Sequence, residues 1–148
     1  GEEVAVLAWL EGGGRVDERF ECDFGDGSRE SGISLLMVAM INGHEGLAEA
    51  LLQRGADVSL QTREGDTALI CAATYGHEKL VELALRHGAE INQQTLGGTA
   101  LMQAAGNGHE EVVDALIRHG ADIDLQNKNG GTALICAAYF NCPAVVLR

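Results

Sequence analysis

Proline is nearly absent from this chain: it occurs once in 148 residues, whereas glycine occurs 20 times. This balance argues against an all-β fold punctuated by proline and favours many short helices whose turns end on glycine. Aromatic residues are scarce as well, at 4%. Hydrophobic residues nevertheless make up 46% of the chain, which is enough to bury a substantial core and argues against wholesale disorder.

Positive charge is also in short supply, with 10 Lys and Arg against 22 Asp and Glu and a net charge of −12. Binding to phosphate groups depends on clustered Lys and Arg, so the composition excludes nucleic acid and an anionic membrane surface as partners. A protein partner with a basic patch is compatible with this charge. Acidity that merely keeps an elongated protein soluble explains it equally well.

Long hydrophobic runs and cysteine motifs are missing. The longest apolar run, Ile33 to Ile41, is broken by Ser34 and is far too short to span a bilayer. The chain begins at Gly1 rather than Met, so we interpret it as a fragment of a longer protein whose targeting signals could have been removed. No CxxC or CxxxC occurs, which is typical of reduced thiols in an intracellular protein, cytoplasmic or nuclear.

What the sequence does contain is an internal repeat. The segment from Thr67 to Ala73, Thr-Ala-Leu-Ile-Cys-Ala-Ala, returns from Thr99 and from Thr132, and Ser34 begins a worn copy, in steps of 33, 32 and 33 residues. Gly-His recurs at 43–44, 76–77 and 108–109, and Gly-Ala-Asp or Gly-Ala-Glu at 55–57, 88–90 and 120–122. Three independent markers with one period predict an array of repeated units.

Each unit is predicted to be a helix, a turn and a second helix. Thr67 is suited to cap the first helix, with its hydroxyl accepting the amide of Ile70. The second helix is expected from Glu78 to Arg86, and it is apolar enough to lie between two neighbouring units. Gly88 then ends this helix, and the short turn-rich segment that follows, 89–98, is expected to form a hairpin. The hairpin of the third unit is one residue shorter than the others.

These markers resemble the ankyrin repeat: Gly-x-Thr-x-Leu-x-x-Ala-Ala, then Gly-His, a Val/Leu-rich helix and Gly-Ala-Asp. The resemblance covers residues 32–142 closely and reaches back to a second helix and its exit turn at 6–17. It implies an all-α fold, an ankyrin-repeat solenoid of helix–turn–helix units linked by short β-hairpin-like turns. It also implies a module that binds other proteins, without indicating which protein.

We therefore expect residues 1–148 to form a single ankyrin-repeat domain. Its parts are a partial repeat (1–17), an inserted acidic loop (18–31), three repeats (32–60, 61–92, 93–124) and a truncated repeat (125–148). Alternation in the insert fits an extended hairpin, in which Phe20 and Phe24 either pack on the first repeats or contact a partner. Val145, Val146 and Leu147 have no following unit to cover them, which predicts weak self-association through this end.

No catalytic, metal or cofactor site emerges from the sequence. His44, His77 and His109 recur at the repeat period, so they should lie roughly 10 Å apart and cannot converge on one zinc ion. We interpret them as hydrogen-bonding residues at the turn between helices. Cys71 and Cys136 share one repeat position in units that are not neighbours and have no nearby base that would activate a thiol. The chain is therefore predicted not to be an enzyme.

By its resemblance to ankyrin repeats, the chain should bind a partner with its hairpin tips and with the concave face of its first helices. The predicted contact residues at the tips are Ile33, Arg63, Glu64, Asp66, Leu96, Lys128 and Asn129, and those at the ends of the first helices are Asn42, Thr74, Tyr75, Asn107, Tyr139 and Phe140. Gly106 and Asn107 should leave a shallow dip between larger neighbours.

Two observations support this map without the resemblance. The positions differ between units while their neighbours repeat, and they include half of the six aromatic residues, which anchor interfaces more often than other side chains do. Drift of an unconstrained solenoid surface is the competing explanation. The leading function is a protein-interaction module. The alternative is an architectural or regulatory segment of a larger multidomain enzyme or signalling protein.

Overall fold

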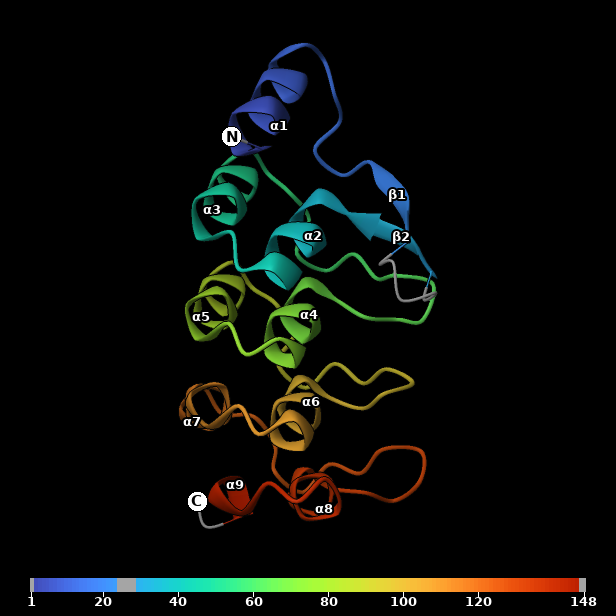
Figure 1. The fold of residues 1–148 in the computed structure, drawn as a ribbon, viewed down its shortest axis with the longest axis vertical. Helices are drawn as coiled ribbons and strands as arrows, with labels where there is room; N and C mark the ends of the chain where they lie inside the picture. The colour runs from blue at the N-terminus through green and yellow to red at the C-terminus, as the bar shows by residue number, and fades with distance from the viewer. Residues whose placement is uncertain (1, 24–28, 147–148) are drawn as a thin grey trace.

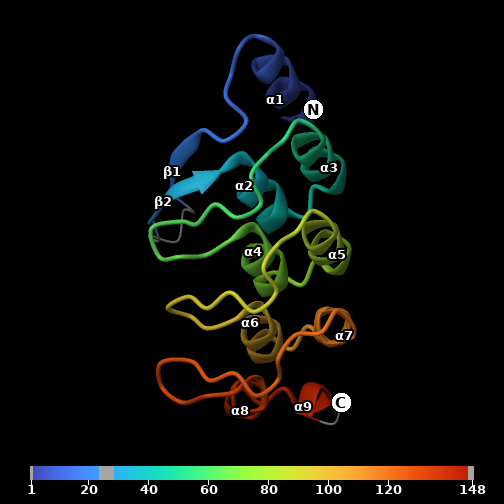
Figure 2. The same cartoon turned by 180° about the vertical axis from the view of Figure 1, so that it is seen from behind.

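The chain folds into two stacked columns of helices with hairpins projecting to one side, as a computed structural model of the protein shows (Figures 1 and 2). The structure describes residues 2–23 and 29–146. The inner column consists of α2 (Leu35–Asn42), α4 (Ala68–Thr74), α6 (Ala100–Asn107) and α8 (Ala133–Tyr139). The outer column consists of α1 (Glu2–Glu11), α3 (Glu45–Gln53), α5 (Glu78–Arg86), α7 (Glu110–Arg118) and α9 (Pro143–Val146). The predicted helical solenoid is confirmed.

A hydroxyl caps every inner helix. The Oγ1 atom of Thr67 accepts the amide of Ile70 at 3.4 Å, which confirms the predicted cap, and Ser34, Thr99 and Thr132 make the same bond. Each of these residues has extended backbone angles, so its side chain can reach one of the amides that have no partner inside the helix. The second helix of this unit, α5, has the predicted bounds.

Alanines bring the inner helices together. Ala39, Ala72, Ala104 and Ala137 occupy one position in successive units, and all four are completely buried. Their small side chains let neighbouring inner helices approach closely, and they belong to one hydrophobic core that runs the length of the stack.

No helix in the described part of the chain is long and apolar enough to cross a membrane.

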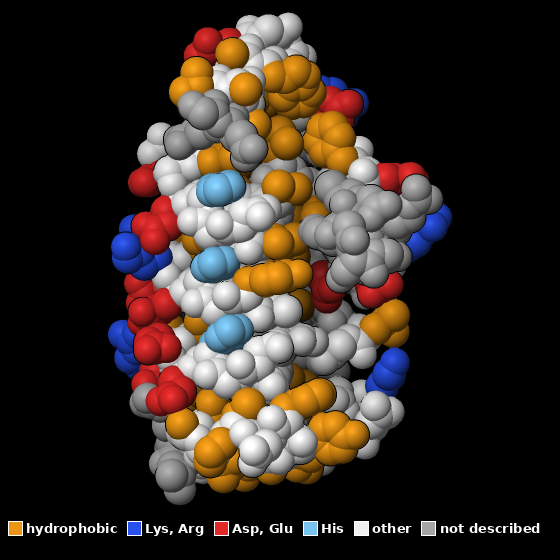
Figure 3. All heavy atoms as spheres, in the orientation of Figure 1, with side chains coloured by type: hydrophobic (Ala, Val, Ile, Leu, Met, Phe, Trp, Pro, Cys, Tyr) orange, Lys and Arg blue, Asp and Glu red, His pale blue; other side chains and the backbone are white. Residues whose placement is uncertain are grey.

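The repeated histidines join one unit to the next. The Nε2 atom of His77 lies 3.0 Å from the carbonyl oxygen of Ile41, and that of His109 lies 2.9 Å from the carbonyl oxygen of Thr74. Since a carbonyl can only accept, each ring donates from Nε2. Figure 3 shows histidine side chains arranged in a column on this face. The predicted hydrogen-bonding role is confirmed for His77 and His109, and each bond connects two units rather than staying within one turn.

The glycines of the first two Gly-His pairs make room for the histidine of the following unit. A Cβ atom on Gly43 would lie 2.8 Å from Cε1 of His77, and one on Gly76 would lie 2.6 Å from Nδ1 of His109. Both glycines also have a left-handed backbone, with φ of 73° and 80°. The two residues of the marker therefore pack at different seams, the interfaces between neighbouring units. The glycine contacts the histidine ring of the following unit, and the histidine bonds to a carbonyl of the preceding unit.

The last unit departs from this arrangement. Asn141 and Cys142 stand where the other units have Gly-His, and Asn141 keeps the left-handed backbone with a φ of 56°. The thiol of Cys142 lies 3.5 Å from the carbonyl oxygen of Gly106, the position equivalent to the carbonyls of Ile41 and Thr74. A thiol is a weak donor, so the seam between the third and fourth units has a weaker bond at this place.

The N-terminal residues behave as part of the array. Helix α1 lies above α3 in the outer column (Figure 1). The carboxylate of Asp17 accepts the amide of Asp57 at 2.9 Å, and two units later the side chain of Asn92 accepts the amide of Asp122 at the same distance. These residues occupy equivalent positions, so the segment ending at Asp17 stacks on its neighbour as the exit turn of a full unit does.

The insert contains an antiparallel hairpin of β1 (Arg19–Asp23) and β2 (Arg29–Ser34), with a bulge between Phe20 and Glu21. The extended hairpin expected for this segment is confirmed. Phe20 packs on the first repeats: its ring meets that of Trp9 edge-on, with centroids 6.4 Å apart, and it touches the core. Phe24 lies outside the described residues.

At the C-terminal end, one of the predicted exposed residues is in fact covered. The prediction for Val145 is wrong: it is buried, because α9 folds back against α8 and α7. Val146 is partly exposed, as predicted, and Leu147 lies outside the described residues.

The larger apolar surface at this end comes from the inner helix instead. Leu134 and Ile135 of α8 are 57% and 55% exposed, whereas their equivalents Leu69 and Ile70 in α4 are 1% and 2% exposed. In α4 these side chains are covered by the following inner helix, α6. The C-terminal end of the stack therefore exposes apolar side chains whose equivalents are buried between units elsewhere in the molecule.

Candidate partner-binding groove

Three hairpins form one wall of the groove. The second and fourth units close theirs with bonds from Thr62 N to Asp66 O and from Asn127 N to Gly131 O, both 2.9 Å long. In the third unit Thr95 and Gly98 exchange bonds of 3.1 Å, so this hairpin is one residue tighter, as its sequence predicts. The inner helices form the other wall, with their carboxyl ends opening into the groove.

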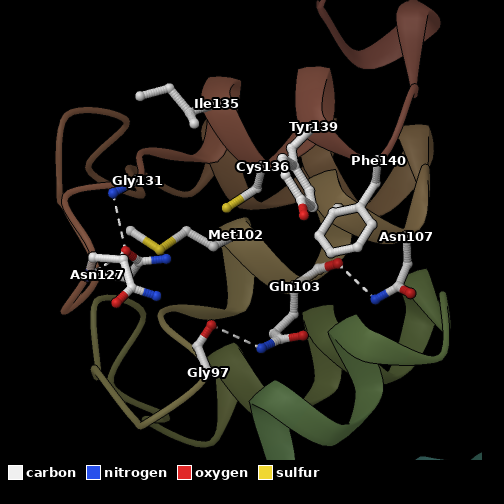
Figure 4. Close-up of a pocket in the computed structure, with 12 residues that line it drawn as sticks. Gly97, Met102, Gln103, Asn107, Asn127, Gly131, Ile135, Cys136, Tyr139 and Phe140 are labelled. Carbon is white, nitrogen blue, oxygen red and sulfur yellow. Dashed lines mark hydrogen bonds between the residues drawn. The ribbon is translucent and has the colours of Figure 1, made fainter.

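A pocket of about 620 Å³ lies in this groove between the third and fourth units (Figure 4). The described residues that line it are uncharged. They are Gly97, Met102, Gln103, Gly106, Asn107, Asn127, Asn129, Gly131, Ile135, Cys136, Tyr139 and Phe140. Helices α6 and α8 contribute most of the surface, and the third and fourth hairpins complete it.

The pocket exists because Gly106 has no side chain. A Cβ atom at this position would lie 3.2 Å from Cδ2 of Phe140, so the ring rests almost directly on the backbone of α6. The equivalent positions in other units carry Ile41 and Thr74, which would fill this space. The predicted dip at Gly106 and Asn107 is confirmed.

Two neighbouring aromatic rings form one side of the pocket. Tyr139 and Phe140 are 82% and 63% exposed, and their rings meet edge to face with centroids 5.1 Å apart. In Figure 4 both rings hang from the end of α8 over the side chains of α6. Exposed aromatic surface of this size, already held in place by a partner ring, is available to a ligand at little cost in conformational entropy.

Side-chain amides form the opposite side. Gln103 donates from Nε2 to the carbonyl oxygen of Gly97 at 2.9 Å, and Asn107 donates from Nδ2 to the carbonyl oxygen of Gln103 at the same distance. Asn127 uses its Oδ1 to accept the amides of Asn129 and Gly131, which holds the fourth hairpin in shape. The amide oxygens of Gln103 and Asn107 remain as acceptors that a ligand can reach.

Beyond the pocket, the groove carries charge. Asp66 on the second hairpin is half-buried, and burial raises the pKa of its carboxyl; a hydrogen bond with Thr95 lowers that pKa in part, and the neighbouring Glu64 raises it further. Arg63 and Glu64 are exposed on the same hairpin, and Lys128 is exposed on the fourth. The uncharged pocket thus lies between a carboxylate-bearing hairpin and a lysine-bearing one.

The thiol in the pocket is not activated. Cys136 is partly buried, and burial raises the pKa of its thiol, which keeps it protonated near neutral pH. Among the described residues, His, Cys, Asp and Glu side chains do not gather in any group of three that could hold a metal ion. The groove therefore presents apolar area, side-chain amides and one half-buried carboxylate.

A comparison with protein families identifies the repeated units. The model of ankyrin repeats (3 copies) matches residues 5–95 and again residues 92–147. This chain belongs to the ankyrin repeat family. A comparison with curated proteins found no match. Ankyrin repeats are in general protein-interaction modules, so the family agrees with the kind of surface that the groove presents.

Most residues predicted at the ankyrin groove are exposed there. Arg63, Glu64, Leu96, Lys128 and Asn129 lie exposed on the hairpins, and Tyr75, Asn107, Tyr139 and Phe140 are exposed at the ends of the inner helices. Two others use their side chains within the helix: the Thr74 hydroxyl donates to the carbonyl of Ile70, and the Asn42 amide donates to that of Val38, both at 2.8 Å.

The prediction for Ile33 is wrong. Its position corresponds to Asp66, Gly98 and Gly131 on the hairpins of the later ankyrin units, but its side chain is completely buried. The insert is the cause: β1 pairs with β2 along this segment, Phe20 lies opposite Ile33, and the side chain turns into the core just before the helix cap at Ser34.

Several pocket residues were not among the predicted contacts, including Met102, Gln103, Asn127, Ile135 and Cys136. Gln103 could have been found, because its position carries Val38, Cys71 and Cys136 in the other ankyrin units and so varies as the predicted contacts do. Asn127 gave a weaker signal, since an asparagine in a hairpin is explained by the turn alone.

Proposed function

We propose that this chain binds another protein through its concave groove, with the pocket between the third and fourth repeats as the central contact. The observation that carries the proposal is the pair of exposed rings, Tyr139 and Phe140, beside a pocket that Gly106 keeps open. Aromatic anchors beside a preformed pocket are the pattern of an interface hot spot. The earlier alternative, an architectural segment without a ligand, offers no reason for so much aromatic exposure in one groove.

The outer helices are a poorer candidate for the partner's site. Their charges are used between units: Lys79 lies 3.4 Å from Glu45, and Arg118 lies 3.3 Å from Glu78. Acidic side chains gather along this edge in Figure 3, but exposed ion pairs contribute little to stability. We expect the outer face to keep the stack soluble while the groove selects the partner.

Other properties follow from the same proposal. The groove binds without catalysis, cofactor or metal, and the net charge of −12 favours a partner with a basic patch over nucleic acid or an anionic membrane. Cys136 and Cys142 are free thiols, which is compatible with an intracellular compartment, cytoplasm or nucleus.

Affinity capture with matched variants tests the proposal. The chain, immobilised, is used to capture partners, and the captured protein is then titrated against Phe140→Ala, Tyr75→Ala and the outer-face control Glu111→Gln. Loss of a central aromatic anchor should weaken binding by about 2 kcal/mol, whereas the control should leave it unchanged. Binding that is lost with Glu111→Gln and kept by the groove variants would place the partner on the other face.

A further inference from the structure

We infer that the groove recognises an extended peptide segment in which a bulky uncharged side chain enters the pocket and a basic side chain, about three residues away, reaches Asp66. This inference rests on the proposed function and adds the chemistry of the partner. It follows from three features of the groove: the uncharged pocket, the half-buried carboxylate on the second hairpin, and the packing of that hairpin against the third hairpin, which lines the pocket.

The pocket favours an uncharged side chain. Met102 and the rings of Tyr139 and Phe140 supply apolar surface, and the described lining includes no charge that could pair with an ion. A charged side chain placed here would lose part of its hydration without gaining a counter-charge, which disfavours its entry. A volume of about 620 Å³ leaves room for an aromatic or a large aliphatic side chain.

Asp66 favours a basic side chain. The carboxyl is half-buried and has lost part of its hydration, as the raised pKa indicates, so a cationic group restores favourable contacts that water no longer provides. Glu64 lies on the same hairpin and adds negative charge. A charge-assisted bond to an arginine or lysine of the partner satisfies this carboxylate better than any neutral donor.

The positive groups nearby do not cancel this preference. Arg19 binds the carbonyl of Gln61 and lies beside Gly32, on the N-terminal side of the second hairpin, whereas Asp66 faces Thr95 on the C-terminal side. Arg63 is exposed and is outnumbered by Glu64 and Asp66 on its own hairpin.

Lys128, at the far end of the pocket, repels a basic side chain from the fourth hairpin. The charges along the groove therefore set the order of the partner's side chains, with the basic one at the second hairpin and the uncharged one at the pocket.

The two subsites are close enough for one short segment. Gly65, next to Asp66, lies against Thr95, and the hairpin that contains Thr95 supplies Gly97 to the pocket. Successive units are stacked roughly 10 Å apart, as packed helices are. An extended chain advances about 3.3 Å per residue, so about three residues cover one step. The amide oxygens of Gln103 and Asn107, which lie in the pocket, can accept main-chain N–H groups of such a segment.

Peptide display tests the inference directly. A random dodecapeptide library is selected on the immobilised wild-type chain, and the enriched peptides are synthesised and titrated by fluorescence anisotropy. We expect a shared pattern of one aromatic or large aliphatic residue and one Arg or Lys about three positions away. Asp66→Asn should weaken such a peptide about tenfold, and Glu111→Gln, which removes the same charge from α7, should not change its affinity.

A double-mutant cycle then assigns the contact. Replacing the basic residue of the peptide by Ala should also cost about tenfold on the wild-type chain, and should cost almost nothing further on Asp66→Asn, because the two changes remove one interaction. The same cycle pairs the apolar residue of the peptide with Phe140→Ala. Circular dichroism and thermal melts of each variant establish that it is folded, and the substitutions on the peptide side do not depend on the fold of the protein.

The possible outcomes separate the inference from the proposed function. Peptides that weaken with Phe140→Ala but show no basic residue, or no coupling to Asp66, overturn the inference and leave the groove as the binding site. Peptides that tolerate every groove change overturn both. A selection that enriches no sequence over an unrelated protein also counts against both.

Discussion

The ring of Phe140 rests on Gly106, with only 3.2 Å between Cδ2 and the place where a Cβ atom of that residue would stand. This contact spans two repeats, since Gly106 lies in α6 and Phe140 follows α8. The pocket is thus a property of the seam rather than of either unit, and one methyl group on one side of the seam changes it.

Gly106→Ala should raise stability and lower binding. Alanine in place of glycine within a helix stabilises it by about 0.5–1 kcal/mol, and Phe140 is exposed enough to shift by the few tenths of an ångström that the new methyl group requires. The same methyl group fills the floor of the pocket, so peptides selected on the wild-type chain should bind less tightly. Urea unfolding and fluorescence anisotropy measure the two effects, and a fall in both would mean that the ring cannot move.

His109→Ala should weaken the seam between the second and third units. The ring donates to the carbonyl oxygen of Thr74 at 2.9 Å, and losing this bond should cost about 1 kcal/mol in urea unfolding. His119→Ala is the matched control, because His119 is exposed at the end of α7. Equal losses of unfolding free energy in the two variants would show that the bond from His109 to Thr74 contributes nothing to stability.

Ala104→Leu should overpack the inner column. Ala104 is completely buried between neighbouring helices, so the larger side chain should destabilise the fold by about 1–3 kcal/mol. Ala138, one position after the buried Ala137, is exposed at the end of the stack, and Ala138→Leu should have little effect. Thermal melts compare the two, and an unchanged melt for Ala104→Leu would mean that the helices have more room than their burial indicates.

Leu134→Lys should reduce self-association. Leu134 is one of the most exposed apolar side chains at the C-terminal end, and contiguous apolar surface of this kind tends to find a partner. Sedimentation at rising concentration should show weak association of the wild-type chain, less for Val146→Lys and least for Leu134→Lys. A strictly monomeric wild-type chain at high concentration would contradict this prediction.

Asp57 should titrate below its ordinary range. The hydroxyl and the amide of Ser59 both donate to this carboxylate, at 2.6 and 2.8 Å, and these bonds lower its pKa. Because the folded pKa is the lower one, the stabilisation is present above the unfolded value of 3.8 and is lost as the pH falls through the folded pKa. Carboxyl titration by NMR should show the pKa rising in Ser59→Ala, and an unchanged pKa would assign the shift to the main-chain amide alone.

Sequence reasoning succeeded where the chain repeats itself. The cap at Thr67, the bounds of α5 and the short third hairpin all follow from comparing one unit with the next, because stacking imposes the same local geometry on each copy. It failed at the edges of the array, where that constraint changes. Ile33 is buried because a strand replaces the ordinary hairpin, and Val145 is buried because a short helix folds back on the stack.

The pocket could be predicted only in part. The dip at Gly106 and the two aromatic residues beside it were visible as departures from the repeat. Gln103 also departs from the repeat, but its place in the pocket, like that of Met102, depends on how α6 and the third hairpin meet in space.

The weak bond of the Cys142 thiol predicts that the stack opens first at the seam between the third and fourth units. The two preceding seams are each held by an imidazole bond, whereas the last is held by a weak sulfur donor. Helices α8 and α9 should therefore separate from α6 before the second and third units separate from the units that precede them, and their amides should exchange with deuterium first. The pocket straddles this same seam. A ligand that contacts Gln103 on one side and Phe140 on the other binds only when the seam is closed. The free energy needed to close the seam therefore reduces the observed affinity of that ligand. The substitution Cys142→His should add an imidazole bond across this seam and stabilise its closed form before the ligand binds. It should therefore slow amide exchange in the last repeat and tighten binding, although residue 142 does not line the pocket.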